Sequence, residues 1–208
     1  MILIGAAAAA AANPIRPAPI GLVAGSSSAS EAHALRVAAI ADQVRSNAGL
    51  LRVQRAGSNR VPNGAICGDH KISLSALSNV IEVTQDAVTV EASCDMESLV
   101  RETLRHHLIP KVVPEFRGIT VGGATQGGAM ESSSHRHGMF HDTLLQAELL
   151  LPNGTAILAS PSQHPELFHA IGGSYGTLCL LTAATVECVP AAPYVRIDLR
   201  WFDDVDEG

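Results

Sequence analysis

The sequence predicts an α+β fold, in which helices and antiparallel strands occupy separate stretches of the chain. Three observations lead to this prediction: a helical apolar pattern at 31–47, and strand pairs around tight turns at 79–94 and at 143–160. A doubly wound sheet would instead show a regular alternation of strands and helices. With 208 residues, the chain can bury a core as one large domain or as two small subdomains.

The composition limits the classes of function. Hydrophobic residues make up 47% of the chain and aromatic residues only 3%, so the core must be aliphatic and rich in alanine. The net charge of -6, without a basic run, argues against binding to nucleic acid. The cysteines form no C-x-x-C pair, and we expect them to be reduced residues in a reducing compartment. They are Cys67, Cys94, Cys179 and Cys188.

The first 28 residues are interpreted as a low-complexity N-terminus. This stretch has no basic residue before Arg16, and the prolines at 14, 17 and 19 interrupt its alanine-rich run, which favours this interpretation over a signal peptide. A membrane helix needs about 20 strongly apolar residues, and the sequence contains no such run.

The elements then follow in order. The helix at 31–47 has Ser30 as a candidate N-cap, and an apolar strand beginning at Leu50 leads into a polar loop. Two strands flank the turn at 84–87. Asp95 can cap the next helix, and Pro110 and Pro114 end it near His107. We expect one face of this helix to be apolar, with Met96, Leu99, Val100, Leu104 and Leu108.

The second half of the chain begins with a hairpin. Its turn at 152–154 also contains a glycosylation sequon, but the turn explains these residues and we discount a sugar. A short helix is expected to start near Ser162, followed by a glycine loop at 172–177 and a long strand at 178–189. Residues 194–201 alternate cleanly between apolar and polar side chains, which predicts a further strand.

Two glycine-rich segments are the candidate site. Gly122, Gly123, Gly127 and Gly128 lack a Cβ atom, so exposed backbone amides there can form a concave anion site for a pyrophosphate. The loop at 172–177 could close on the same ligand, which suggests a long cofactor. Ordinary tight turns are the alternative. The pattern is not the Rossmann fingerprint, because no G-x-G-x-x-G opens a helix after a first strand.

Metal and acyl-transfer chemistry are not predicted. His135, His137 and His141 fall close together, but no cysteine is nearby and the closest carboxylates lack a ligand spacing. Ser174 in "GGSYG" imitates the spacing of G-x-S-x-G, but the segment lacks the nucleophile-elbow pattern. No catalytic residue is identified.

The segments "ITVGGATQGGAMESSSHRHG", "ELFHAIGGSYGTLCLLTAATVECVPA" and "YVRIDL" resemble the FAD-binding domain of the delta-24 sterol reductase family, within the p-cresol methylhydroxylase (PCMH)/vanillyl-alcohol oxidase superfamily. The resemblance covers about residues 50 to 200. It implies a PCMH-type fold of two α+β subdomains, 29–110 and 111–192, with the flavin between them. Residues 193–208 would begin a substrate domain whose remainder is missing.

The resemblance also implies cofactor-binding residues. The backbone amides of the four glycines would hold the pyrophosphate, while Ser132, Ser133 and His135 would donate hydrogen bonds toward the flavin end. The complete set is Ser58, Asn59, Thr120, Val121, Gly122, Gly123, Ala124, Thr125, Gln126, Gly127, Gly128, Ala129, Met130, Glu131, Ser132, Ser133, His135, Gly173, Ser174, Gly176 and Thr177.

The sequence departs from the family pattern at three places. His137 replaces an aromatic residue usual before a glycine, and Cys179 stands where many relatives have glycine. Covalent flavin attachment in the superfamily uses a His or Cys in the early loop, and residues 55–63 contain neither, so we expect non-covalent FAD. The chain also ends where relatives continue into the substrate domain.

The expected function is therefore that of an FAD-dependent oxidoreductase, in which flavin reduced by NADPH passes hydride to a side-chain double bond of a sterol or another hydrophobic alkene. A non-catalytic flavin-binding module is the alternative. An intracellular location is expected, at the endoplasmic reticulum membrane for a eukaryotic sterol reductase and in the cytoplasm otherwise. Peripheral membrane association and the oligomeric state remain open.

Overall fold

The computed structural model describes residues 3–4, 28–47, 49, 51–54, 70–199 and 201. Its elements in chain order are β1 Leu3–Ile4, α1 Ser28–Arg45, β2 Leu51–Gln54, β3 His70–Ser73, β4 Val80–Val83, β5 Ala87–Glu91, α2 Met96–Arg105, β6 Leu108–Pro110, α3 Val121–Gly127, α4 Ser134–His137, the 3-10 helix η1 Phe140–Thr143, β7 Leu144–Leu150, β8 Ala156–Ala159, α5 Pro165–Ala170 and β9 Leu180–Pro190.

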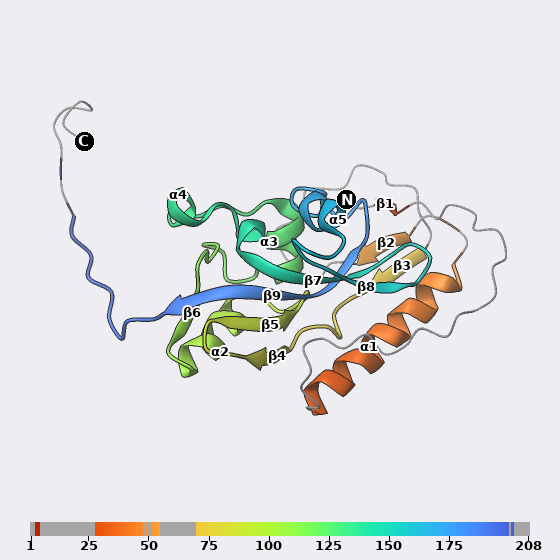
Figure 1. The fold of residues 1–208 in the computed structure, drawn as a ribbon, viewed down its shortest axis with the longest axis horizontal. Helices are drawn as coiled ribbons and strands as arrows, with labels where there is room; N and C mark the ends of the chain where they lie inside the picture. The colour runs from red at the N-terminus through yellow and green to blue at the C-terminus, as the bar shows by residue number, and fades with distance from the viewer. Residues whose placement is uncertain are drawn as a thin grey trace.

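Two sheets organise the chain, which confirms the α+β prediction. The small sheet has the order β1-β2-β3, with β2 and β3 parallel. The large sheet has the order β4-β5-β9-β7-β8, all neighbours antiparallel, and β6 pairs separately with β9. Figure 1 shows α3 and α5 above the large sheet and α1 below it.

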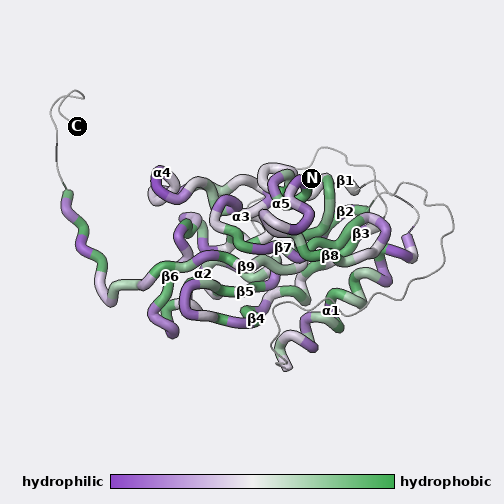
Figure 2. The backbone as a smooth tube through the Cα atoms, in the orientation of Figure 1, coloured by the Kyte–Doolittle hydropathy of each residue, from purple (hydrophilic) through white to green (hydrophobic). Residues whose placement is uncertain are grey.

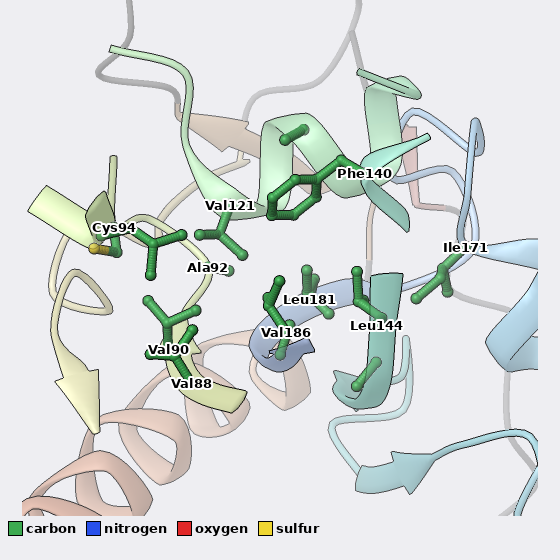
Figure 3. Close-up of a cluster of buried hydrophobic side chains, with 14 of the residues drawn as sticks. Val88, Val90, Ala92, Cys94, Val121, Phe140, Leu144, Ile171, Leu181 and Val186 are labelled. Carbon is green, nitrogen blue, oxygen red and sulfur yellow. The ribbon is translucent and has the colours of Figure 1, made fainter. Parts of the chain in front are cut away.

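The larger hydrophobic cluster fills the space between the sheet and the segment from α3 to η1. Figure 3 shows Val121 of α3 and Phe140 of η1 facing Leu181 and Val186 of β9, and all four side chains are buried. Helices α3 and η1 therefore turn an apolar side toward the sheet. Their other side is available for other contacts. The strands of the sheet carry the most continuous apolar stretches in Figure 2.

Helix α1 joins the two sheets through a second hydrophobic cluster. Val37 and Ile40 of α1 pack with Ile72 of β3 and with Leu150 and Leu180 of the large sheet. Because each of these side chains is less than 10% exposed, α1 and its contacts fix the small sheet against the large one. Within the described residues, no helix is both long and apolar enough to cross a membrane.

Several sequence predictions need correction. Helix α1 starts at Ser28, so Ser30 lies inside it and is not its N-cap. Leu3–Ile4 forms a short strand in the stretch interpreted as low-complexity, and β3 was not predicted. Helix α5 begins at Pro165, since proline is favoured in the first helical turn, and not near Ser162.

Helix α2 is confirmed, with two changes to its apolar face. Asp95 accepts a hydrogen bond from Ser98 N at 2.8 Å, and the helix ends at Arg105. Leu104 is 46% exposed and does not belong to the buried face, whereas Thr103 does. Leu108 is buried, but it belongs to strand β6.

Residues 191–199 contain no strand, which corrects the prediction for 194–201. Figure 1 shows this segment projecting away from the body, and Figure 2 shows its alternating hydropathy. Val195, Ile197, Leu199 and Trp201 are 76% to 93% exposed. A strand requires a neighbour for its backbone groups, and the described residues provide none here.

Candidate functional site

The first glycine segment forms a helix, although glycine disfavours helix formation. Thr120 caps α3 by accepting a hydrogen bond from Gly123 N at 3.1 Å, and Gly128 ends it in the left-handed conformation, with φ of 69°. Each interior glycine costs about 1 kcal/mol of helix propensity relative to alanine. Burial of Val121 and Ala124 against the sheet outweighs this cost.

The backbone amides at the start of α3 are already used. Gly122 N donates to Ala92 O at 2.7 Å, and Gly123 N donates to the Thr120 side chain. At the other end, Gly128 N donates to Ala124 O. The expectation that these amides are free to hold a pyrophosphate therefore needs correction. Gly122 serves another purpose: a Cβ atom there would lie 3.1 Å from Ala92 O.

Glycine instead gives α3 a bare outer surface. Gly123 and Gly127 are exposed and lie four residues apart, so they share one side of the helix. A Cβ atom on Gly127 would meet nothing within 4 Å, and one on Gly123 would meet only the Thr120 hydroxyl of its own cap. A flat ligand can therefore approach the helix backbone closely along this side.

The second glycine segment lies directly against the first. Tyr175 N donates to Gln126 O at 2.8 Å, and Gln126 Nε2 donates to Cys179 O at 3.2 Å. Tyr175 has a positive φ of 53°, between Gly173 at 70° and Gly176 at 72°. The two segments therefore lie side by side, since residues about 50 positions apart in the chain are joined by hydrogen bonds, and closure on one shared ligand stays a prediction.

Most polar groups of the second segment form hydrogen bonds within the segment or with the residue just before it. Ser174 Oγ donates to Ile171 O at 2.8 Å, and Thr177 Oγ1 donates to Ser174 O at 2.8 Å. Gly176 N donates to Ser174 Oγ at 3.3 Å. The segment is thus a hydrogen-bonded turn, and Gly173 is its exposed bare position, with nothing within 4 Å of a Cβ atom there.

The polar groups of the serine and histidine stretch also form hydrogen bonds with the protein itself. Ser133 Oγ donates to Lys111 O at 2.9 Å, and His135 Nδ1 lies 2.7 Å from Ser132 O. Glu131 N donates to Ser134 Oγ at 2.9 Å. The hydrogen bonds that Ser133 and His135 were expected to give to a flavin therefore go to the protein backbone.

Exposed apolar side chains accompany the bare backbone. Met130, which follows the first glycine segment, is 70% exposed, and Tyr175 and Leu178 in or beside the second segment are 57% and 41% exposed. Large apolar side chains at high exposure beside a smooth surface are typical of a ligand site. The sequence pattern did not single out Tyr175 or Leu178.

His141 and Gly172 form a contact that sequence reasoning also missed. A Cβ atom on Gly172 would lie 2.4 Å from His141 Cδ2, so only glycine fits there without movement of the ring. Two side-chain atoms among the described residues, His141 Nδ1 and Thr125 Oγ1, are buried without a hydrogen-bond partner. Both belong to the two elements, α3 and η1, that support the glycine surface.

Two further predictions concern other parts of the chain. Ser58 and Asn59, in the expected first cofactor loop, lie outside the described residues. Across the described part of the chain, no three His, Cys, Asp or Glu residues could share a metal ion. A surface hollow between β4 and α2, lined partly by Asn79 and Arg105, is formed by neither glycine segment.

Comparisons with known proteins match this chain to one family model and to several named relatives. The family model described as "FAD binding domain" matches residues 30–160. A delta(24)-sterol reductase of Pisum sativum is 34% identical over 133 residues, which cover 62% of this chain and 24% of that protein. The Homo sapiens delta(24)-sterol reductase is 34% identical over 130 residues, with 62% and 25% covered. The chain thus spans about a quarter of the length of these relatives.

A solved structure is similar in fold. The crystal structure of 6-hydroxy-D-nicotine oxidase from Arthrobacter nicotinovorans superposes with a TM-score of 0.64 at 22% identity, covering 74% of this chain and 35% of that one.

Proposed function

The chain belongs to the FAD binding domain family, and from this premise we propose that it is the cofactor-binding part of an FAD-dependent oxidoreductase similar to the delta-24 sterol reductases. Its fold is the PCMH-type FAD-binding fold. The observation that carries the proposal is the contact between the two glycine segments, marked by the hydrogen bond from Tyr175 N to Gln126 O.

The described residues fit the flat parts of FAD better than its diphosphate. Gly123, Gly127 and Gly173 leave bare backbone, and Met130 and Tyr175 supply apolar surface for a ring system. Since the amides of Gly122 and Gly123 are occupied, we assign the diphosphate to other donors, and we keep Ser58 and Asn59 as proposed contacts.

The rest of the predicted set forms the frame of this site. Val121, Ala124 and Thr125 are buried and hold α3 on the sheet, and Thr120 caps the helix. The other proposed contacts, which follow α3 or line the second segment, are Gly128, Ala129, Glu131, Ser132, Ser133, His135, Ser174, Gly176 and Thr177.

The chemistry of the proposal comes from the cofactor. Bound FAD would supply hydride transfer, with NADPH as the proposed donor and a sterol or another hydrophobic alkene as the proposed acceptor. This chain would bind and orient FAD without a covalent bond. Yellow colour that stays with the protein after acid precipitation would contradict the non-covalent attachment.

The bare side of α3 gives a direct test of cofactor binding. Gly127→Leu places a side chain where nothing touches a Cβ atom, so we expect a folded protein of unchanged or higher thermal stability whose FAD affinity falls at least tenfold. The measurement is the quenching of FAD fluorescence on titration with protein.

Gly118→Leu is the matched control, because Gly118 also has nothing within 4 Å of a Cβ atom and precedes the cap of α3. It should bind FAD like the unaltered protein. If unaltered protein does not bind FAD, or if Gly127→Leu binds as tightly as Gly118→Leu, the proposed site is wrong.

The alternative is a flavin-binding module without catalysis. The protein loaded with FAD would be mixed with NADPH, with and without a delta-24 sterol, and followed by bleaching of the flavin absorbance. Bleaching by NADPH and reoxidation by the sterol support the reductase. Binding of FAD without either reaction supports the module, and the sterol arm then has to be repeated with the longer protein.

A further inference from the structure

A buried cluster of charged side chains lies on the opposite side of the large sheet from α3. His33 of α1, which is 1% exposed, places Nδ1 at 2.7 Å from Glu91 Oε1 of β5 and Nε2 at 3.0 Å from Glu148 Oε1 of β7. We call this set, with Arg36, the His33 cluster. The proposed FAD site uses none of its members.

The sheet register explains how two distant glutamates reach one imidazole. Glu91 of β5 and Glu148 of β7 are both paired with Ala183 of the central strand β9, so the three residues form one row across the sheet. Neighbouring strands are about 4.8 Å apart, which puts the backbones of the two glutamates roughly 10 Å apart. The small side chain of Ala183 leaves room for the His33 ring between them.

With both glutamates ionised, the geometry requires a charged histidine. A neutral imidazole has only one N–H, whereas here both ring nitrogens face carboxylate oxygens, and only imidazolium can donate to both. Arg36, one turn along α1, donates to Glu91 Oε1 through Nε at 2.9 Å and Nη2 at 2.7 Å. Two cations then face two anions, and the buried cluster is neutral.

Further donors also reach both carboxylates. Glu91 Oε2 accepts from Asn79 N and Nδ2, both at 2.8 Å, and Thr182 Oγ1 donates to Glu148 Oε1 at 2.6 Å. Buried ions are tolerated when such additional hydrogen bonds accompany the ion pair. Loss of the imidazole proton would leave a carboxylate facing a lone pair inside the protein.

We propose that the charged form of His33 fastens the N-terminal half of α1 to the large sheet, and that removal of its proton at alkaline pH releases α1 while the sheet stays folded. Helix α1 also packs on β2 and β3, so its release would loosen the small sheet. In the described part of the chain, the charged groups of the cluster come from β5 (Glu91), from β7 (Glu148) and from α1 itself (Arg36), so the effect is local to α1 and these strands.

Titration of the cluster sets the direction of the effect. Burial alone would lower the pKa of His33, but the hydrogen bonds and charges of Glu148 and Glu91 raise it to about 9. Its contribution is therefore complete below about pH 6.5 and is lost as the pH rises through about 9. Burial would raise the pKa of Glu91, yet hydrogen bonds from His33, Asn79 and Arg36 lower it to about 2.

Hydrogen exchange measured by mass spectrometry tests the proposal on the whole chain. Between pH 7 and pH 10, after correction for the intrinsic rates, protection of residues 28–45 should fall at least about tenfold more than that of α2, residues 96–105. Ring ¹⁵N spectra of histidine-labelled protein, with His33→Gln for assignment, should show a charged His33 at pH 8.

Two glutamine variants complete the test. Glu148→Gln keeps the shape and the acceptor but removes one charge, so the release of α1 should move to lower pH. Glu102→Gln, which alters a half-buried carboxylate of α2 that lies 3.7 Å from His106, should leave it unchanged. Equal loss of protection in α1 and α2, a flat profile to pH 10, or a neutral His33 ring at pH 8 would overturn the proposal.

Discussion

The glycines of α3 differ in what surrounds them, although the sequence presents them as one repeated pattern. Gly122 faces the backbone of Ala92, Gly127 faces open space, and Gly128 has a positive φ. From the sequence alone, the glycines could be identified as positions where the backbone needs close approach or an unusual conformation. The sequence could not show which glycine is closely approached, which is exposed and which ends the helix, because these roles depend on how the segment packs on the sheet.

Alanine substitutions distinguish these roles. Gly122→Ala brings a methyl group to 3.1 Å from Ala92 O, so we expect a loss of about 1–3 kcal/mol in the free energy of unfolding. Gly127→Ala meets nothing and removes the entropic cost of glycine, so a gain of about 0.5–1 kcal/mol is expected. Urea denaturation measures both, and equal effects of the two variants would contradict the assignment.

The buried cysteines should be unreactive. Burial raises the pKa of Cys94 and of Cys179 to about 12 and that of Cys188 to about 11, and nearby carboxylates add to the rise for Cys94 and Cys188. In a Cys67→Ser background, the native protein at pH 8 should react with a thiol reagent far more slowly than the urea-unfolded protein. Rapid labelling of the native variant would refute this expectation.

At the scale of elements, the capping of α2 was predictable because it is local. Asp95 lies three residues before Ser98, whose amide it accepts at 2.8 Å. Asp95→Ala should cost about 1 kcal/mol of stability, whereas Asp95→Asn should cost only a few tenths, because asparagine is an equally good cap. Thermal unfolding of the two variants side by side gives the comparison, and equal losses would mean that the cap is not the cause.

The errors in element prediction have physical causes. Helix α3 forms against its propensity because Val121 and Ala124 are buried against the sheet, a long-range effect that a local pattern does not contain. Residues 194–201 do alternate between apolar and polar side chains, but a strand also needs a hydrogen-bonded neighbour. The hairpin of β7 and β8 was predictable because its turn, with Gly154 at φ of 76°, is encoded beside its strands.

At the scale of the molecule, the His33 cluster shows what a single sequence hides. His33 is 58 residues from Glu91 and 115 from Glu148, and α1 looks like an ordinary amphipathic helix. The only sequence signal is a glutamate within each apolar strand, at "VTVE" and "QAELLL". That the two glycine segments could meet was suggested by their glycine content, whereas FAD as the ligand came only from the family resemblance.

Removal of Glu91 should destabilise the whole fold. Glu91→Ala would leave His33 and Arg36 without their shared acceptor in a site where Glu91 itself is fully buried, and we expect a loss of about 3–5 kcal/mol. Chemical denaturation at pH 6 measures this loss. The exposed counterpart Glu97→Ala, which breaks an i,i+4 pair with Arg101, should cost less than about 1 kcal/mol.

The projecting segment at 191–199, with Trp201, also determines which optical signals are informative. The single tryptophan of the chain, Trp201, is 93% exposed and lies outside both hydrophobic clusters. Its fluorescence should therefore resemble that of free indole in water and change little when the sheets unfold. The same property makes Trp201 a sensitive reporter for any molecule that comes to cover this segment.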